Sequence, residues 1–226
     1  MKSQLRINAF LATALRISRR KADQVVAENR VMVNGSAATV GQVIDLGHDR
    51  VTVDGSVVEN QTLNKTRIVL YKPREYITSR TDQWGRKTVI DLLPEHLKHL
   101  NTAGRLDYLS EGVILMSDDG AFNHEYTHPR FEKEKEYILT LTEPVAKDLI
   151  EGFRTGVPLQ EGLAKADTVD QISEKALRVT IHQGWKRQLR RMAAHHGFTV
   201  HSLVRTRIGQ FEIEGLQPGE WMVISN

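Results

Sequence analysis

The chain has 226 residues, 40% of them hydrophobic and 26% charged, with a formal net charge of +3; this is typical of a globular protein of one or two domains. Cysteine is absent, which excludes disulfides, cysteine-ligated metal sites and thiol nucleophiles. No apolar run approaches the roughly 18 residues of a membrane span. The N-terminus, MKSQLRINAF, also lacks the apolar core of a signal peptide, so we expect an intracellular, cytoplasmic protein.

Positive charge gathers near both ends of the chain. Residues 1–30 contain seven Lys or Arg and two acidic residues, whereas residues 175–211 contain eight Lys or Arg and no acidic residue. Surface helices usually interleave both signs of charge, so a long acid-free stretch favours contact with phosphates over a merely solvated face. Two basic regions therefore indicate a polyanionic partner.

The first sixty residues predict a small αβ module. Apolar residues recur at helical spacing over 5–15, and Ser18 can cap a second helix that begins with three basic residues, Arg19, Arg20 and Lys21. The dipeptide Asn34-Gly35 between apolar runs predicts a two-residue hairpin, and the β-like segment DRVTVDG follows. The basic helix start favours phosphate binding, because backbone N–H groups there add to the positive charge.

The stretch RINAFLATALRISRRKADQVVAENRVMVNG resembles the S4-like RNA-binding domain. It has the Arg-led first helix, the S-R-R element and the V-x-V-N-G hairpin of that domain, although a glycine usual before S-R-R is absent. The resemblance implies that Arg19, Arg20 and Lys21 bind RNA. The polar segment 54–66 reads as a linker, so we expect an S4-like domain with linker over 1–62 and a second domain over 63–226.

Residues 63–226 predict an α+β domain on a mostly antiparallel mixed β-sheet. Six short β-like runs, among them RIVLYKP, VILMS and EYILTLTE, alternate with at least two helices, over 143–154 and 186–197. Within this domain HEYTH (124–128) fits the H-E-x-x-H zinc pattern. Pro129 disfavours helical backbone at His128, however, so this histidine can only end a helix. We expect no metal site here.

Segment 104–120, GRLDYLSEGVILMSDDG, holds Asp107 in a turn before an apolar strand. A turn aspartate is by itself as often a cap or Asx-turn former as a functional residue. This segment resembles the central G-R-L-D motif of the RsuA-type ribosomal RNA pseudouridine synthases. Further segments follow the same family in order: YKP (71–73), TDQWGRKTVIDLLP (81–94), HPRFEKEKEY (128–137) and GWKRQLRRM (184–192).

The resemblance implies the site residues. Asp107 is the catalytic aspartate, Arg190 the arginine that pairs with it, and Tyr137 the tyrosine that stacks on the target base. Leu189 packs against the other face of the base, and Arg105 fills the gap left by an extruded nucleotide. From residues alone, Tyr137 and Leu189 are as easily core side chains. We also expect substrate contacts from Lys72, Arg187 and Arg191.

The function implied is that of an isomerase converting a specific uridine of ribosomal RNA to pseudouridine, acting as a monomer on ribosomal RNA or an assembly intermediate. The reaction has no redox step and no external group carrier, so we expect no cofactor. The large-subunit RNA is favoured, with the small-subunit RNA second. The alternative is a non-catalytic RNA-binding or ribosome-assembly protein that keeps the fold. The departures YKPREY and SEG (110–112) from the family pattern bear on substrate identity.

Overall fold

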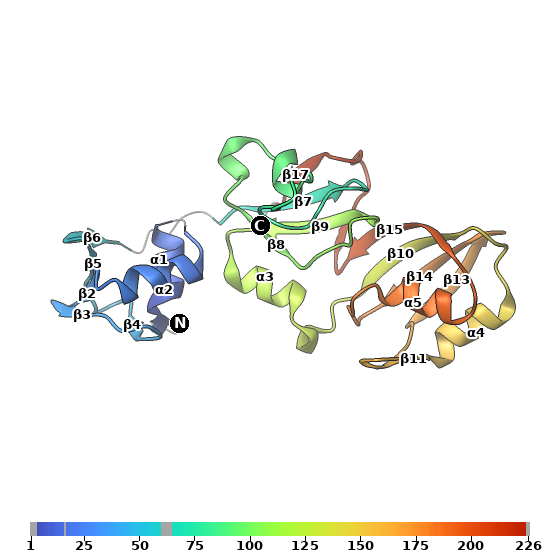
Figure 1. Ribbon diagram of the computed structural model, residues 1–226, viewed down its shortest axis with the longest axis horizontal. Helices are drawn as coiled ribbons and strands as arrows, with labels where there is room; N and C mark the ends of the chain where they lie inside the picture. Colours follow the sequence, from blue (N-terminus) through green and yellow to red (C-terminus); the bar gives the residue numbers. More distant parts are fainter. Residues whose placement is uncertain (1–3, 16, 60–64, 225–226) are drawn as a thin grey trace. The chain divides into compact units, whose positions relative to one another are not determined.

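The computed structural model describes residues 4–15, 17–59 and 65–224. The chain divides into two compact units, residues 1–64 and 65–226 (Figure 1). Each unit has its own hydrophobic core and is described by itself. Among the described residues, no helix is long and apolar enough to cross a membrane.

The N-terminal unit packs two helices on small β-sheets. Helices α1 (Ile7–Ala14) and α2 (Arg19–Ala27) bury one face each against the strands. One sheet has the order β3-β2-β5-β6, and β1 pairs with β4. The strands of this unit are β1 (Gln4–Arg6), β2 (Val31–Val33), β3 (Ser36–Ala37), β4 (Val43–Asp45), β5 (Val51–Val53) and β6 (Ser56–Val58).

Two local predictions for this unit are confirmed. The Ser18 side chain accepts a hydrogen bond from the backbone N–H of Lys21 at 3.1 Å, which caps α2. Asn34 and Gly35 join β2 to β3 with φ of 53° and 81°, the left-handed backbone that a two-residue hairpin requires. The Asn34 side chain also bonds to Asp49 and to the N–H of Arg50, so it ties the hairpin to the next strand.

The second unit is an α+β fold on a nine-stranded mixed sheet, as predicted. Its order is β13-β14-β10-β15-β9-β7-β17, with β16 beside β15 and β8 beside β9. Among the strands that the structure describes, only the β15–β9 pairing within this sheet is parallel. The strands are β7 (Arg67–Lys72), β8 (Asn101–Ala103), β9 (Glu111–Ser117), β10 (Lys135–Leu141), β13 (Thr168–Ser173), β14 (Ala176–Ile181), β15 (Val200–Ile208), β16 (Phe211–Glu212) and β17 (Trp221–Val223); β11 (Val157–Leu159) and β12 (Gly162–Ala164) form a separate hairpin.

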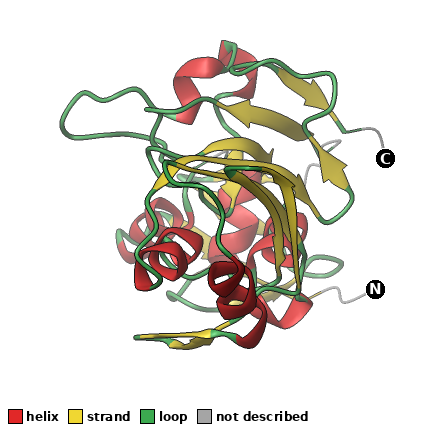
Figure 2. Ribbon diagram, turned by 90° about the vertical axis from the view of Figure 1, so that its right-hand side faces the viewer, coloured by secondary structure: helices red, strands yellow, loops and turns green. Residues whose placement is uncertain are grey.

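Helices cover the sheet in two places (Figure 2). Helices α4 (Lys147–Thr155) and α5 (Gln188–His195) pack on strands β10, β13 and β14 in one large core. On β7 and β9, alternate residues enter two other cores, because successive side chains of a strand face opposite sides. One contains the 3₁₀ helices η1 (Val89–Leu92) and η2 (Glu95–Leu97), and the other contains α3 (Gly120–Thr127).

The helices begin and end differently from the ranges expected from sequence. Helix α4 begins at Lys147 rather than 143, because Pro144 lies in the segment that precedes it. Helix α5 covers Gln188–His195 instead of 186–197; Arg187 before it has a left-handed φ of 52°. Helix α3 was not expected as an element, since its buried residues, Phe122 and Tyr126, give only a short apolar pattern.

Asp119 joins the start of this unit to the N-terminus of α3. Its carboxylate accepts hydrogen bonds from Lys65 (2.9 Å), Arg67 (2.8 Å) and the N–H of Ala121 (3.1 Å). Burial alone raises the pKa of Asp119, but the two cationic partners outweigh it and hold the pKa at about 2. The charged carboxylate therefore stabilises the fold above its unfolded pKa near 3.8, and this contribution is lost as the pH falls toward 2.

We therefore expect Asp119→Asn to lower the free energy of unfolding by ~2 kcal/mol at pH 7. The difference from wild type should shrink between pH 4 and pH 3, as the wild-type carboxylate begins to protonate in the unfolded chain. Urea unfolding at pH 7, 5 and 3 measures this difference in unfolding free energy, with Asp148→Asn, at an exposed position, as the control. An unchanged difference at all three pH values contradicts the assignment.

Candidate active site

Asp107 lies in the loop that joins β8 to β9. Its backbone carbonyl accepts hydrogen bonds from the N–H of Ser110 at 3.0 Å and from the Lys72 Nζ at 3.2 Å. Leu106, immediately before it, is buried and exchanges two hydrogen bonds with the Thr78 hydroxyl, through its own N–H and carbonyl. The loop is thus fixed on both sides of the carboxylate, while the Asp107 residue itself is only half-buried.

Lys72 is fully buried at the end of β7. Its ammonium donates to three backbone carbonyls, those of Pro73 (2.9 Å), Asp107 (3.2 Å) and Ser110 (2.7 Å). Burial lowers the pKa of Lys72 to about 8, opposed by the Asp107 and Glu111 carboxylates. The expected substrate contact of Lys72 does not agree with this placement, because no part of the side chain reaches the surface. Lys72 instead holds the Asp107 loop.

Arg190 on α5 reaches the same loop from the other side. Its guanidinium donates to the carbonyls of Leu109 (3.1 Å) and Val200 (2.9 Å). Burial lowers the pKa of Arg190, as does the nearby Arg187, while the Asp107 carboxylate raises it. Over the part of the chain that the structure describes, no ion pair within 4.0 Å joins Asp107 to Arg190. Arg190 is therefore brought beside the aspartate and anchored to its loop rather than bonded to its carboxylate.

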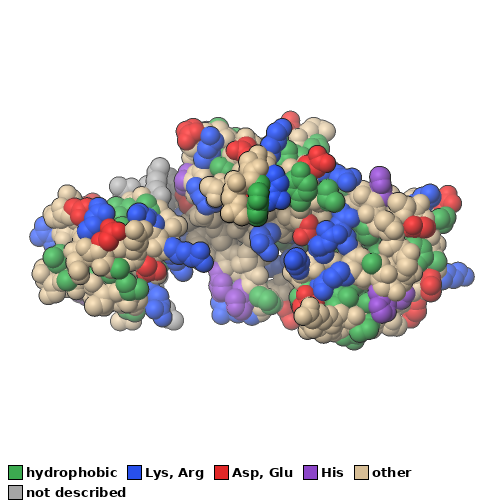
Figure 3. Space-filling view, viewed as in Figure 1, with side chains coloured by type: hydrophobic (Ala, Val, Ile, Leu, Met, Phe, Trp, Pro, Cys, Tyr) green, Lys and Arg blue, Asp and Glu red, His purple; other side chains and the backbone are tan. Residues whose placement is uncertain are grey.

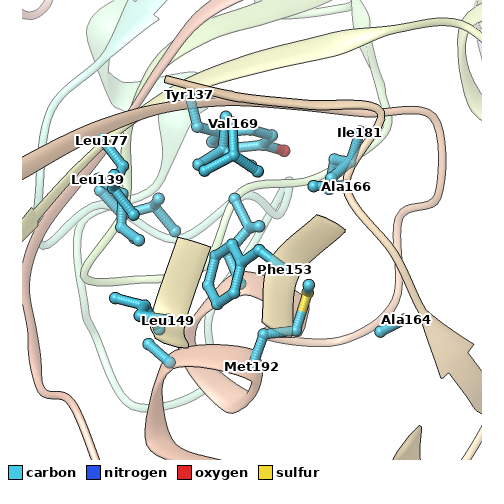
Figure 4. Packing of buried hydrophobic residues seen from close by; sticks show 14 of the residues in the cluster. Tyr137, Leu139, Leu149, Phe153, Ala164, Ala166, Val169, Leu177, Ile181 and Met192 are labelled. Atoms are coloured by element: carbon cyan, nitrogen blue, oxygen red, sulfur yellow. The ribbon is translucent and has the colours of Figure 1, made fainter. Parts of the chain in front are cut away.

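Tyr137 and Leu189 share one core cluster with Leu106. Tyr137 is 8% exposed on β10, opposite Val179 of β14 and Arg205 of β15. Leu189 is 3% exposed in the first turn of α5. Figure 4 shows Tyr137 at one side of the cluster, with side chains of α4 and α5 at the other. An apolar wall thus adjoins the loop that carries Asp107.

The predicted cationic substrate contacts fall into two groups. Arg105, two residues before Asp107, and Arg187, at the start of α5, are exposed. Arg191 is instead held by both carboxylate oxygens of Glu161, at 2.8 and 2.9 Å. The guanidinium is thus engaged by a partner that lies 30 residues away in sequence, and the substrate contact of Arg191 stays a prediction. Figure 3 shows Lys and Arg side chains gathered on one face of this unit.

The HEYTH segment forms the end of α3. His128 is its C-cap, with extended backbone, and the His128 Nδ1 accepts a hydrogen bond from the N–H of Arg130 at 3.2 Å. The Nδ1 atom of His128 is therefore occupied by a backbone hydrogen bond and is not free to bind a metal ion. Within the described ranges, no group of three His, Cys, Asp or Glu side chains is placed to hold a metal ion.

Sequence reasoning missed two buried cations near the site. Lys135 donates to the carbonyls of Lys133 and His182, and burial lowers its pKa to about 8. Arg205 is 3% exposed and donates through Nε to the Val113 carbonyl at 2.8 Å. For Arg205 the available signal was a charged residue inside an apolar strand, which is rarely buried without a specific partner; Lys135 stands in the charged run EKEKEY and gave no such signal.

Gly112 permits the close approach of β9 to β15 at this point. It has φ of 110°, and a Cβ there would lie 2.1 Å from the carbonyl oxygen of Arg205. Only glycine fits this contact, since the clash is with backbone rather than with a movable side chain. The glycine of the SEG segment therefore allows β9, which begins directly after the Asp107 loop, to lie this close to β15.

Comparison with protein families matches residues 66–195 to the model described as RNA pseudouridylate synthase. The chain is 32% identical over 219 residues to the dual-specificity RNA pseudouridine synthase RluF of Escherichia coli (strain K12), covering 97% of this chain and 75% of that protein. It is 33% identical to ribosomal large subunit pseudouridine synthase B of Bacillus subtilis (strain 168), covering 95% and 90%.

Two further matches extend over nearly the whole chain. Ribosomal small subunit pseudouridine synthase A of Salmonella typhimurium is 37% identical, over 96% of this chain and 95% of that protein. A solved structure titled as the crystal structure of pseudouridylate synthase superposes with a TM-score of 0.70 at 26% identity, covering 98% and 96% of the two chains. The relatives carry names for both ribosomal subunits.

Proposed function

The chain belongs to the RNA pseudouridylate synthase family, and from this premise we propose that it isomerises a uridine of ribosomal RNA to pseudouridine through Asp107. The observation that carries the proposal is a half-buried carboxylate on a loop fixed by Lys72, Thr78 and Arg190. A binding protein has no need to hold an acid in this way among cations. We further propose that the enzyme acts as a cytoplasmic monomer.

The reaction breaks the N1–C1′ bond of uridine, turns the uracil and joins C1′ to C5; the C5 proton then leaves, and N1 takes up a proton, so the product is an isomer of the substrate. An ionised carboxylate serves either as the nucleophile at the sugar or as the base that removes a sugar proton. The Asp107 carboxylate interacts electrostatically with the Arg190 guanidinium, so positive charge lies beside the reacting group. Hydrogen bonds to the carbonyls of Leu106, Asp107, Leu109 and Ser110 hold the backbone on both sides of this carboxylate.

A uridine in folded RNA is reached only after it leaves the stack, at a cost of a few kcal/mol. We propose that Tyr137 and Leu189 form the apolar wall against which the extruded uracil lies, since both border the cluster that contains Leu106. Arg105 is exposed two residues before Asp107, so it is placed to fill the vacated position. Arg187 is the exposed cation suited to a flanking phosphate.

The test uses unmodified transcripts of both ribosomal RNAs of the source organism. Incubation with the protein should yield pseudouridine at one position, and we place that position in the large-subunit RNA. Carbodiimide labelling followed by primer extension locates it. Pseudouridine in the small-subunit transcript alone moves the target to that RNA. Failure to form pseudouridine in either transcript, or in their partly assembled subunits, overturns the proposed function.

We propose that the N-terminal unit is an S4-like RNA-binding domain with Arg19, Arg20 and Lys21 as its phosphate contacts. All three side chains are exposed at the N-terminal end of α2. In the first turn of a helix, backbone N–H groups and positive side chains favour the same anion.

Replacing these three residues with Ala should weaken RNA binding by about tenfold or more at 0.1 M salt, and lower the slope of log K against log salt by about two. Filter binding at four salt concentrations measures both quantities. Arg30→Ala is the control, since Asp54 and Glu28 already neutralise that arginine in the same unit. An unchanged salt slope contradicts the phosphate contacts.

A further inference from the structure

Trp84 stands out from the other tryptophans in its exposure. It is 70% exposed in the segment between β7 and η1, whereas Trp185 and Trp221 are half-buried and packed against cores. Residues 83–87 around it are exposed. Tryptophan carries the largest apolar surface of any side chain and is usually well covered, so this placement needs a reason.

The segment around Trp84 is held in one conformation by Asp82. Its carboxylate accepts hydrogen bonds from the N–H groups of Trp84 (3.1 Å) and Arg86 (3.0 Å), and from the Arg86 guanidinium at 3.1 and 2.8 Å. The Arg86 guanidinium also lies over the indole, 4.8 Å from the ring centroid. The indole is therefore presented by an ordered loop, so little conformational entropy is lost when a partner binds.

The base of this loop is tied to the Asp107 loop. The two ends of the loop meet at Ile77, whose backbone N–H donates to the Lys87 carbonyl and whose carbonyl accepts from the N–H of Val89. The next residue, Thr78, exchanges the two hydrogen bonds with Leu106 described above. The loop that carries Trp84 and Arg86 is thus anchored at its base to the Asp107 loop, within the same unit.

The charge and polarity of the residues next to Trp84 indicate which kind of partner would bind there. The segment 80–88 contains three cations, Arg80, Arg86 and Lys87, against one acid, Asp82; Asp82 pairs with Arg86, so Arg80 and Lys87 leave a net positive charge. The residues that flank the indole in sequence are polar or glycine, so this stretch offers no run of apolar side chains for a protein partner. An exposed aromatic ring among cations matches single-stranded RNA, whose bases stack on it while its phosphates meet the positive charge.

We propose that Trp84 stacks on an unpaired nucleobase next to the target uridine, held there by Arg86 and Asp82. This inference rests on the proposed function, since extrusion of a uridine leaves its neighbours without their stacking partner. The contact forms on binding and is retained through the reaction, so it contributes to affinity and to KM rather than to kcat.

The test compares Trp84→Ala, Trp84→Phe and Ile172→Ala, the last removing another exposed hydrophobic side chain on edge strand β13. The probes are fluorescein-labelled octauridylate, a blunt twelve-base-pair RNA duplex and the ribosomal transcripts. Trp84→Ala should bind octauridylate about tenfold more weakly than wild type, as expected for loss of one base stack. It should bind the duplex equally well, with an unchanged salt slope, because no charge is lost.

Trp84→Phe should recover most of the affinity, and Ile172→Ala should match wild type. On the transcripts, Trp84→Ala should raise KM by a similar factor and leave kcat near its wild-type value. Wild-type affinity and KM in Trp84→Ala, with normal pseudouridine formation, overturn the stacking and leave the proposed function standing. If wild type forms no pseudouridine while Trp84→Ala still loses affinity for octauridylate, the proposed function fails and the stacking stands.

Discussion

Asp107→Asn should abolish pseudouridine formation while leaving RNA affinity within about twofold of wild type. The amide has nearly the shape of the carboxylate but carries no charge, and it is neither a nucleophile nor a base at neutral pH. The hydrogen bonds that fix this loop, from Lys72 and Ser110, go to the backbone carbonyl of residue 107, so the substitution leaves them in place. The rate of isomerisation should fall by at least about a thousandfold.

Single-turnover assays with enzyme in excess over the ribosomal transcript measure the loss, and filter binding measures the affinity. Asp170→Asn is the matched control, because Asp170 is an exposed carboxylate of the same unit on β13. Turnover within tenfold of wild type in Asp107→Asn removes the aspartate from its role. A parallel loss of RNA affinity points instead to a collapsed loop.

The parts of the fold that sequence predicted are those decided by neighbours along the chain. The Ser18 cap needs only the N–H three residues on, and the Asn34-Gly35 hairpin needs only two left-handed residues. The Asp107 loop was located by a contiguous motif, GRLD, ahead of an apolar strand that proves to be β9. In each case the physical cause lies within a few residues of the signal.

The parts that sequence missed depend on partners distant in the chain. Lys72 and Arg191 both read as surface cations suited to a substrate. Lys72 is instead committed to carbonyls up to 38 residues away, and Arg191 to Glu161. Trp84 lies within a segment that resembles a family motif, and nothing local distinguishes an exposed indole from a buried one. Trp84 is an exception to this dependence on distant partners, because the hydrogen bonds that fix its segment come from Asp82, two residues before it.

Lys72→Met should both destabilise the protein and slow the reaction. Methionine fills a similar volume but leaves the carbonyls of Pro73, Asp107 and Ser110 without their donor. Losing these charge-assisted bonds outweighs the relief of a buried charge, and the unfolding free energy should fall by ~3 kcal/mol at pH 7. The loosened Asp107 loop should also lower kcat on the order of a hundredfold, as expected when a reacting group is misplaced by about 1 Å.

The effect of Lys72 on stability should depend on pH in a defined direction. Burial lowers the pKa of Lys72 from 10.5 to about 8 in the folded protein. Between pH 8 and pH 10.5, Lys72 is protonated in the unfolded chain but deprotonated in the folded protein. The free energy of unfolding of the wild type therefore rises with pH relative to that of Lys72→Met. Between pH 7 and pH 9.5 the free-energy gap between the two proteins should therefore widen, on the order of 2 kcal/mol.

Urea unfolding of wild type, Lys72→Met and Lys175→Met at both pH values tests this. Lys175 also donates to a backbone carbonyl, that of Thr142 at 2.9 Å, but it is exposed. Its replacement should cost little, with no dependence on pH. A Lys72→Met gap that stays constant as the pH rises means that the ammonium keeps its ordinary pKa in the fold, and a gap that narrows means that the fold raises this pKa. The three carbonyls would then fully compensate its burial, and the Asp107 loop would be held by a cation that does not titrate in this range.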